Sequence, residues 1–373
     1  MKRVVIIGGL GFIGLELSRY LVNAGHEVTV IDNLSPQIHG DVPVVVAPAG
    51  VSVVRLDVRE LADRPELIQG ADAVFHLAAE TGTGQSMYRI AHYVSVNEMG
   101  TAALLEAIAK CTHRPKKVIV ASSRSVYGEG AYVTEREPEK IVQPKPRTRL
   151  DLDSGRWEPL DTDGIALLAV PTPESLPFAP GSVYAATKAS QELLLNSASA
   201  ALGINCIVFR FQNVYGEGQS LQNPYTGIIS IFFNRARQGL EIPVYEDGLE
   251  SRDFIHVHDI VRALTDSLDS EVHNGAIMNL GSGRPTTVIE LARELLAASG
   301  LDVPVRVTGQ FRVGDIRHCF ADLTEAKRLI GFEPCISLAE GLRRFCTWAS
   351  HQPAYEDKLS QATEELRRKG LAN

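Results

Sequence analysis

The chain has 373 residues, of which 45% are hydrophobic, and it carries a net charge of -8. This composition is typical of a globular protein with room for one large α/β domain and an appended lobe, or for two domains. The acidic balance disfavours nucleic-acid binding, because phosphates are neutralised by clustered Lys and Arg. No segment reaches the roughly 18 uninterrupted apolar residues of a membrane span, so we expect no membrane association.

The cysteines are odd in number, scattered, and nowhere in C-x-x-C spacing. They are Cys111, Cys206, Cys319, Cys335 and Cys346. Such a pattern favours free thiols in a reducing compartment over a disulfide framework, and it disfavours zinc. We therefore expect a cytoplasmic protein without a bound metal.

Short apolar runs alternate with longer segments of helical composition. The runs predict six strands, over residues 4–7, 27–31, 51–56, 73–76, 117–121 and 204–209. The longer segments predict helices over 12–24 and 88–110, and another that begins near Ser182. Strands and helices that alternate in this way form a parallel sheet covered on both faces. We therefore predict the fold class α/β, with a doubly wound parallel (Rossmann) sheet.

After residue 210 the elements become shorter, as expected of a smaller C-terminal α/β lobe that binds the substrate. We expect residues 1–210 to form the dinucleotide-binding domain. Residues 211–373 should form mainly the substrate lobe, with some segments returning to the first domain.

The stretch 132–180 is irregular and holds eight of the chain's 19 prolines. Proline removes a backbone donor and disfavours helix before it, so we expect a long excursion from the sheet. Loops of this length are usually functional or disordered. Trp157 favours an ordered loop that packs against another part of the protein. The stretch lies in sequence between Ser123 and Tyr184, so we expect it to cover the active site, and a tolerated surface insertion is the alternative.

A glycine-rich turn follows the first predicted strand, with Gly8, Gly11 and Gly14 spaced G-x-x-G-x-x-G. Such glycines let the backbone approach a pyrophosphate, and the next helix offers free N–H groups and a positive dipole. Asp32 ends the second strand, where a carboxylate accepts hydrogen bonds from the adenosine ribose. Because a 2′-phosphate would be repelled there, the sequence favours NAD over NADP.

Tyr184 and Lys188 lie four residues apart and so share one face of the predicted helix. A phenol titrates near 10, so it can act as an acid or base at neutral pH only beside positive charge. Lys188, one turn along, supplies such a charge.

The glycine turn, Asp32 and the Tyr184–Lys188 pair are accompanied by further motifs along the chain. The motifs are residues 57–58, 76–79, Asn97 with 100–101, 122–123, 126–128, Arg210 with 213–216, 252–254, Asp259, 279–281, 314–315 and 338–341. Together they resemble the extended short-chain dehydrogenases/reductases, in the nucleotide-sugar epimerase/dehydratase branch. The resemblance covers almost the whole chain.

The resemblance implies roles for individual residues. Tyr184, Lys188 and Ser123 would be catalytic, although a serine at a strand end can also simply satisfy the backbone. The implied NAD-binding residues are Gly8, Gly11, Phe12, Ile13, Gly14, Asp32, Asn33, Asp57, Val58, Leu77, Ala78, Ala79, Asn97, Tyr184 and Lys188. The implied substrate-binding residues are Arg124, Asn213, Arg252, Arg312 and Asp315, where arginine suits a diphosphate because its fork binds two oxygens.

Arg124 and Ser125 occupy the two positions that are acidic in the family's 4,6-dehydratases. An acid–base pair for water loss is therefore missing, which favours epimerisation or simple oxidoreduction. Residues 124–132, 219–227 and 311–322 resemble the family's 4-epimerases of dTDP-linked 6-deoxyhexoses such as dTDP-L-rhamnose. The alternatives are a nucleotide-sugar 4-ketoreductase and a catalytically inactive dinucleotide sensor.

The family resemblance also implies a homodimer. Its members pair two helices from each subunit in a four-helix bundle, here the helices near 88–110 and 182–201. Their apolar residues could instead face only the sheet.

Overall fold

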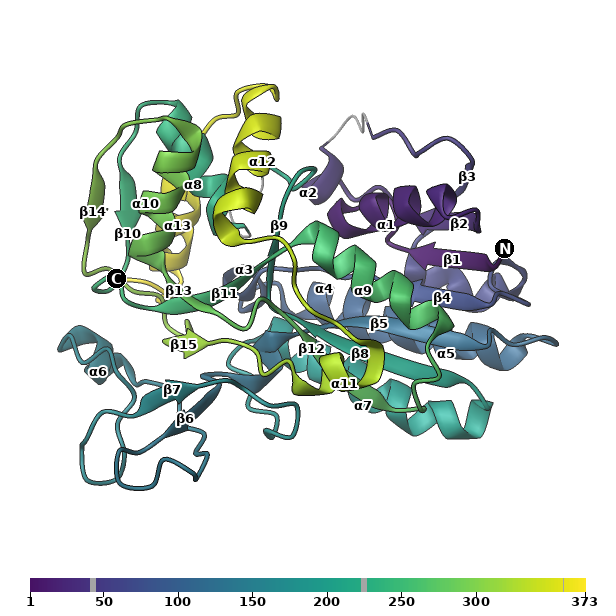
Figure 1. The fold of residues 1–373 in the computed structure, drawn as a ribbon, viewed down its shortest axis with the longest axis horizontal. Coiled ribbons are helices and arrows are strands. Elements are labelled where there is room, and N and C mark those ends of the chain that lie inside the picture. The colour runs from purple at the N-terminus through teal and green to yellow at the C-terminus, as the bar shows by residue number, and fades with distance from the viewer. Residues whose placement is uncertain (41–44, 223–226, 358) are drawn as a thin grey trace.

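The computed structural model describes residues 1–40, 45–222, 227–357 and 359–373. Its centre is a seven-stranded parallel sheet in the order β12-β8-β5-β4-β1-β2-β3 (Figure 1). The strands are β1 (Arg3–Ile7), β2 (Glu27–Asp32), β3 (Val51–Arg55), β4 (Ala73–His76), β5 (Lys117–Ser123), β8 (Asn205–Phe211) and β12 (Ala276–Leu280). The strand order reverses between β1 and β4, and ligands of such sheets bind at that point, outside the carboxyl ends. The predicted doubly wound α/β fold is confirmed.

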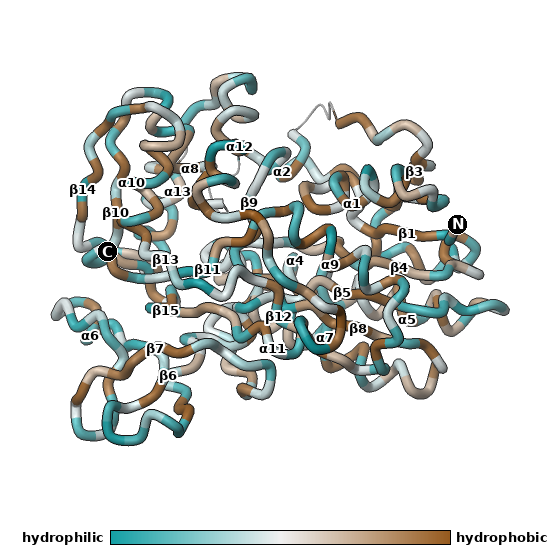
Figure 2. Tube along the Cα trace, in the orientation of Figure 1, coloured by the Kyte–Doolittle hydropathy of each residue, from teal (hydrophilic) through white to brown (hydrophobic). Residues whose placement is uncertain are grey.

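Alternate residues of the strands supply two apolar cores, one on each face of the sheet. Val4 and Ile6 face a core shared with α1 (Phe12–Asn23) and α9 (Val257–Asp269). Val5 and Ile7 face the opposite core, shared with α5 (Gly100–Lys110) and α7 (Val183–Leu202). Because both faces of the inner strands are buried, these strands are mostly continuous apolar runs, visible as brown segments along the central strands in Figure 2. The edge strand β3 is instead largely exposed.

A second lobe packs around its own apolar core, which includes Phe232, Phe233, Leu291 and Phe345. Its elements are α8 (Ile228–Arg237), β10 (Ile242–Val244), α10 (Val288–Ser299), β14 (Val305–Val307), α12 (Leu338–Ser350) and α13 (Leu359–Arg368). A small sheet runs between the lobe and the central sheet, built from β9 (Asn213–Tyr215), β11 (Ser251–His256), β13 (Pro285–Thr287) and β15 (His318–Cys319). The C-terminal half also returns α9, β12 and α11 (Thr324–Ile330) to the central sheet layer (Figure 1).

The stretch 132–180 is ordered in the structure and lies against the second lobe near β15 (Figure 1). β6 (Ala131–Val133) pairs antiparallel with β7 (Leu168–Val170), and α6 (Arg149–Asp153) begins at a capping box on Thr148. The ring of Trp157 packs 6.3 Å from that of Phe311.

The helical stretch before β5 is continuous but not regular. It comprises α4 (Ile90–Tyr93), a π-helical segment (Val94–Met99) and α5. The wide turn buries Asn97, whose Oδ1 accepts from the Glu80 N–H at 2.8 Å and whose Nδ2 donates to Thr187 Oγ1 at 2.9 Å. The sequence predicts a regular helix here, and the structure instead has a π-helical segment; such turns occur often at functional sites.

None of the helices in the described residues is long and apolar enough to cross a membrane.

Candidate active site

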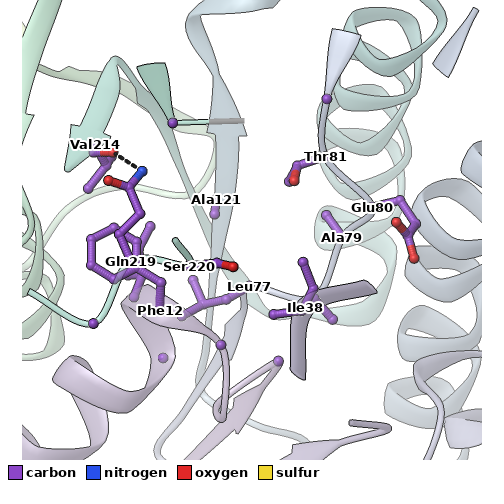
Figure 3. Close-up of a pocket in the computed structure, with 18 of the residues that line it drawn as sticks. Phe12, Ile38, Leu77, Ala79, Glu80, Thr81, Ala121, Val214, Gln219 and Ser220 are labelled. Carbon is purple, nitrogen blue, oxygen red and sulfur yellow. Dashed lines mark hydrogen bonds between the residues drawn. The ribbon is translucent and has the colours of Figure 1, made fainter. Parts of the chain in front are cut away.

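A cavity of about 710 Å³ opens at the carboxyl ends of β1, β2, β4 and β5. Figure 3 shows Val214 and Gln219 on one side, Ala79, Glu80 and Thr81 on the other, and Ala121 of β5 between them. A dashed line there marks the 3.5 Å contact from Gln219 Nε2 to the Val214 carbonyl. The cavity lies at the switch point of the sheet, so the topology itself supplies the crevice.

The glycine turn forms one end of this cavity. Gly8 has φ +81°, and a Cβ on it would lie 2.6 Å from the amide nitrogen of Ala78. A Cβ on Gly14 would lie 2.5 Å from the Gly8 carbonyl oxygen. Gly11 is the N-cap of α1 and offers no side chain to the first helical amides, so those amides remain available to a ligand. The turn therefore fits a pyrophosphate, which binds at such helix N-termini.

Asp32 is 8% exposed and lines the cavity. Its Oδ2 accepts from the Leu10 N–H at 3.0 Å, and its Oδ1 accepts from the Leu34 N–H at 2.9 Å. Burial raises the pKa of this carboxyl, but His39, whose Nε2 lies 3.7 Å from Oδ1, and the two N–H donors outweigh burial and hold the pKa below its usual value. A carboxylate has about four acceptor positions, so Asp32 retains capacity for ribose hydroxyls.

Asn33 and Asp57 lie at the neighbouring strand ends, with Asn33 Nδ2 donating to Asp57 Oδ2 at 3.0 Å. The Arg59 guanidinium, 2.8 Å from the same oxygen, holds the Asp57 pKa far below its usual value. Of the predicted NAD-binding residues, Asp57 and Asn97 are outside the cavity lining. The others line it: Gly8, Gly11, Phe12, Ile13, Gly14, Asp32, Asn33, Val58, Leu77, Ala78, Ala79, Tyr184 and Lys188.

Tyr184 lies in the first turn of α7, which begins at Ser182, whose Oγ accepts from the Ala185 N–H. Burial raises the pKa of the Tyr184 phenol, while the neighbouring Ser123 hydroxyl and the charge of Arg124 act in the opposite direction. The positive end of α7 also favours a phenolate. Tyr184, Ser123 and Arg124 all line the cavity, so the proton-transfer group meets its polar partners there.

Lys188 lies one turn further along α7, and its Nζ donates to the Ala121 carbonyl at 2.8 Å. Burial lowers the pKa of this ammonium to about 8, with Glu192 acting against the shift. Lys188 therefore ties α7 to the end of β5, two residues before Ser123.

Arg124 and Asn213 both line the cavity and are joined by a 3.2 Å hydrogen bond from Arg124 Nε to Asn213 Oδ1. The other three predicted substrate residues are not part of its lining. Arg252 donates to the carbonyls of residues 251, 316 and 317. The guanidinium of Arg312 stacks 5.0 Å from the Tyr245 ring, and its buried Nε has no hydrogen-bond partner among the described residues. Asp315 follows in the same segment.

Sequence reasoning missed a buried ion pair behind the catalytic set. Arg210 Nη2 donates to Glu192 Oε2 at 2.8 Å, and Ser122 Oγ donates to the other oxygen of the carboxylate. The spacing of Tyr184, Lys188 and Glu192, four residues each, could have shown that all three share one helical face.

The sequence also did not predict some residues that line the cavity from the C-terminal half of the chain. Trp348, Gln352 and Tyr355 line it without belonging to any motif. Of the stretch 219–227 named above, residues 219–222 and 227 line the cavity, and 223–226 lie outside the described residues.

The turn at Gly8, the carboxylate of Asp32 and the Tyr184 helix define the class of the protein, a short-chain dehydrogenase/reductase. More narrowly, the chain belongs to the NAD dependent epimerase/dehydratase family, whose model matches residues 4–149 and 166–281. NAD is therefore the cofactor, in agreement with the prediction. The unmatched residues 150–165 fall inside the stretch 132–180.

Characterised relatives and solved structures agree with this family. A dTDP-L-rhamnose 4-epimerase of Burkholderia thailandensis is 37% identical over 94% of this chain and 96% of its own length. A UDP-glucose 4-epimerase structure from Thermotoga maritima superposes with a TM-score of 0.76 at 27% identity, over 93% of this chain and 98% of the other. A UDP-N-acetylglucosamine 4-epimerase from Methanobrevibacter ruminantium gives a TM-score of 0.75 at 30% identity, over 94% and 99%.

Proposed function

We propose that the protein is an NAD-dependent nucleotide-sugar 4-epimerase that acts on a dTDP-linked 6-deoxyhexose such as dTDP-L-rhamnose. The observation that carries this proposal is that Tyr184, Ser123 and Arg124 line one cavity, with Arg124 at a position where a dehydratase has an acid. The family and the 37% identity to a dTDP-L-rhamnose 4-epimerase support it.

When bound, NAD supplies a hydride acceptor and donor at C4 of the sugar. Tyr184 takes the proton of the C4 hydroxyl. It returns the proton after the 4-keto sugar has rotated in the cavity and presents its other face to the cofactor. Ser123, which lines the cavity with Tyr184, orients that hydroxyl, and the charge of Arg124 stabilises the phenolate. Lys188 adds positive charge from the same helical face and holds the end of β5.

The arrangement favours epimerisation over water loss. Elimination needs a base beside C5 and a carboxylic acid beside C6 of the sugar, and this chain has Arg124 and Ser125 at the positions of that pair. Ser125 Oγ instead donates to Ser123 Oγ at 3.0 Å and so supports the hydroxyl network. A 4-ketoreductase remains the alternative from the same site chemistry, and an inactive dinucleotide sensor is the alternative of another class.

Purified protein with bound NAD tests these three functions. An epimerase converts its nucleotide sugar without added NADH, because the cofactor is regenerated in each turnover. Stoichiometric consumption of added NADH would instead identify a ketoreductase. Tight NAD binding without turnover of any nucleotide sugar would identify a sensor.

We further propose that residues 1–210 carry the NAD site and that 211–373 supply most nucleotide-sugar contacts, with Arg124 contributed from the first part. Arg252, Arg312 and Asp315 would turn toward a bound diphosphate and sugar. The buried and unpaired Nε of Arg312 supports this role, since an unsatisfied buried donor is costly without a ligand. The five free thiols support a location in the reducing cytosol.

A homodimer through α5, α7 and the residues before α5 completes the proposal. Buried residues of these helices face the sheet, but Leu193, Leu194 and Met99 are 55%, 37% and 59% exposed. Such apolar exposure on adjacent helices favours an isologous interface. Leu193→Glu should give a monomer in solution scattering, whereas Leu168→Glu, at a similarly exposed site in β7, should not. A monomeric wild-type protein at micromolar concentration would contradict the dimer.

A further inference from the structure

Arg147 is a buried arginine that joins three distant parts of the chain. It lies in the stretch 132–180, with its side chain 3% exposed. Its Nη1 pairs with Glu246 at 2.8 Å, and its Nε lies 3.3 Å from Glu129. Its Nη2 donates to the carbonyl of Asp315 at 2.8 Å. Arginine suits such a junction because its planar fork holds several acceptors at once.

A second buried arginine shares the same carboxylates. Arg317 contacts Glu246 at 3.0 Å, and its main-chain N–H donates to Glu129. It also contacts Asp247 at 2.7 Å and Glu158, from the stretch 132–180, at 2.6 Å. Each buried charge in this cluster depends on its partners, because a buried charge without a counter-charge is strongly destabilising.

Residues 312–317, the segment that ends at Arg317, are held in place from two sides. Arg147 holds it from the stretch 132–180, while Arg252 of β11 donates to the carbonyls of Ile316 at 2.7 Å and Arg317 at 3.0 Å. A Cβ on Gly314 would lie 3.2 Å from the carbonyl of Gly181, directly before the helix that carries Tyr184. The position of this segment is therefore coupled to the start of α7.

Charged residues in this segment and on β11 act on the cavity lining. Arg252 and Asp315 are among the charged groups that act on the guanidinium of Arg124, which lines the cavity. By contrast, no described residue of 132–180 lines the cavity. The stretch thus contacts the segment 312–317 and does not form part of the described cavity wall.

We propose that Arg147 is a positioning residue, which fixes the segment 312–317 and thereby sets the affinity for the nucleotide sugar and the retention of its 4-keto form. This inference rests on the proposed 4-epimerase function. It assigns to the stretch 132–180 a role in substrate affinity that needs no contact between the stretch and the sugar.

Arg147→Lys tests the proposal, because lysine keeps the charge for Glu246 but cannot also reach the Asp315 carbonyl in the fork geometry. The matched control is Arg156→Lys, in the same stretch, where the arginine is half-exposed and pairs with Asp151. In Arg147→Lys the Kd for dTDP, measured by calorimetry, and the KM for the nucleotide sugar should rise by about tenfold or more, the effect of losing one charge-assisted hydrogen bond. NAD affinity should stay within about twofold, and free 4-keto sugar should be detectable by mass spectrometry.

If Arg147 had a purely structural role, Arg147→Lys would unfold at a lower midpoint. Its affinities for dTDP and for NAD would then not change by different factors. If Arg147→Lys folds and its Kd for dTDP and KM for the nucleotide sugar equal those of Arg156→Lys, the proposal is overturned. If Arg147→Lys does not fold, Glu246→Gln serves in its place, since Glu246 pairs with Arg147 Nη1 and glutamine keeps the size of the side chain without its charge. Its dTDP affinity should fall while its NAD affinity is kept, and unchanged dTDP affinity overturns the proposal. Wild-type binding of dTDP without any turnover overturns the proposed function alone, and wild-type failure to bind dTDP overturns both.

Discussion

The packing of the glycine turn predicts a specific stability loss for Gly8→Ala. Gly8 has φ +81°, and the new Cβ would lie 2.6, 2.7 and 2.9 Å from three main-chain atoms of Ala78 and Leu77. An alanine in left-handed geometry costs about 1–2 kcal/mol. Overpacking against atoms that cannot rotate away adds about 1–3 kcal/mol. The free energy of unfolding should therefore fall by about 2–5 kcal/mol.

Two alanine variants separate these contributions. Gly25 also has φ +81° but has no atom within 4 Å of its Cβ position, so Gly25→Ala should cost only the backbone part. Gly11 has φ -70°, and its Cβ would have only the Gly8 oxygen nearby, at 3.4 Å. Gly11→Ala should keep its stability and lose NAD affinity, because the new methyl enters the pyrophosphate site.

Urea unfolding followed by circular dichroism, with calorimetry for NAD, measures all three variants. Gly8→Ala should unfold at lower urea than Gly25→Ala, and the difference isolates the clash with the Ala78 backbone. Equal midpoints for these two variants would refute the close packing of the turn against the loop after β4. Full NAD affinity in Gly11→Ala would refute the placement of the pyrophosphate.

Three further predictions concern the chemistry. Tyr184→Phe should bind NAD and substrate normally and lose about 10²-fold or more in kcat, so a near-normal rate would contradict its role as acid and base. Asp32→Ser should narrow the preference for NAD over NADP measured by calorimetry, and comparable NADP affinity in the wild type would remove that assignment. The pKa of Lys188 is lowered by burial to about 8, so its supporting charge is present below that pH and lost above it. A plot of kcat against pH should fall on the alkaline side near 8, and a flat profile to pH 9.5 would exclude this role for Lys188.

The central sheet could be predicted because all of its strands except the edge strand β3 are largely buried on both faces. Each strand is then a short apolar run, and local composition alone distinguishes it from the helices. β12 is also parallel and buried, but it follows many short elements, so its return to the sheet depends on contacts that no local pattern records.

The residues of the cofactor site could be predicted where a local geometry demands them. Gly8 and Gly14 are each required by the close packing of one turn, and Asp32 by its place at the end of one strand. Arg147 could not be predicted in this way, since a charged residue in a proline-rich stretch normally lies in solvent. Its burial results from contacts with Glu246 and Asp315, 99 and 168 residues away. Glu192 could be predicted only in part. Its spacing from Tyr184 and Lys188 places it on their helical face, but its partner Arg210 lies on another element and could not be inferred from that spacing.

The most direct test of the proposed function is the stereochemistry at C4. The purified protein, with NAD bound and no NADH added, is incubated with dTDP-L-rhamnose and with UDP-glucose, and the products are analysed by proton NMR. We predict that dTDP-L-rhamnose reaches an equilibrium mixture with its C4 epimer while UDP-glucose is converted far more slowly. Unchanged dTDP-L-rhamnose, with NAD bound and the protein folded, would contradict the proposal.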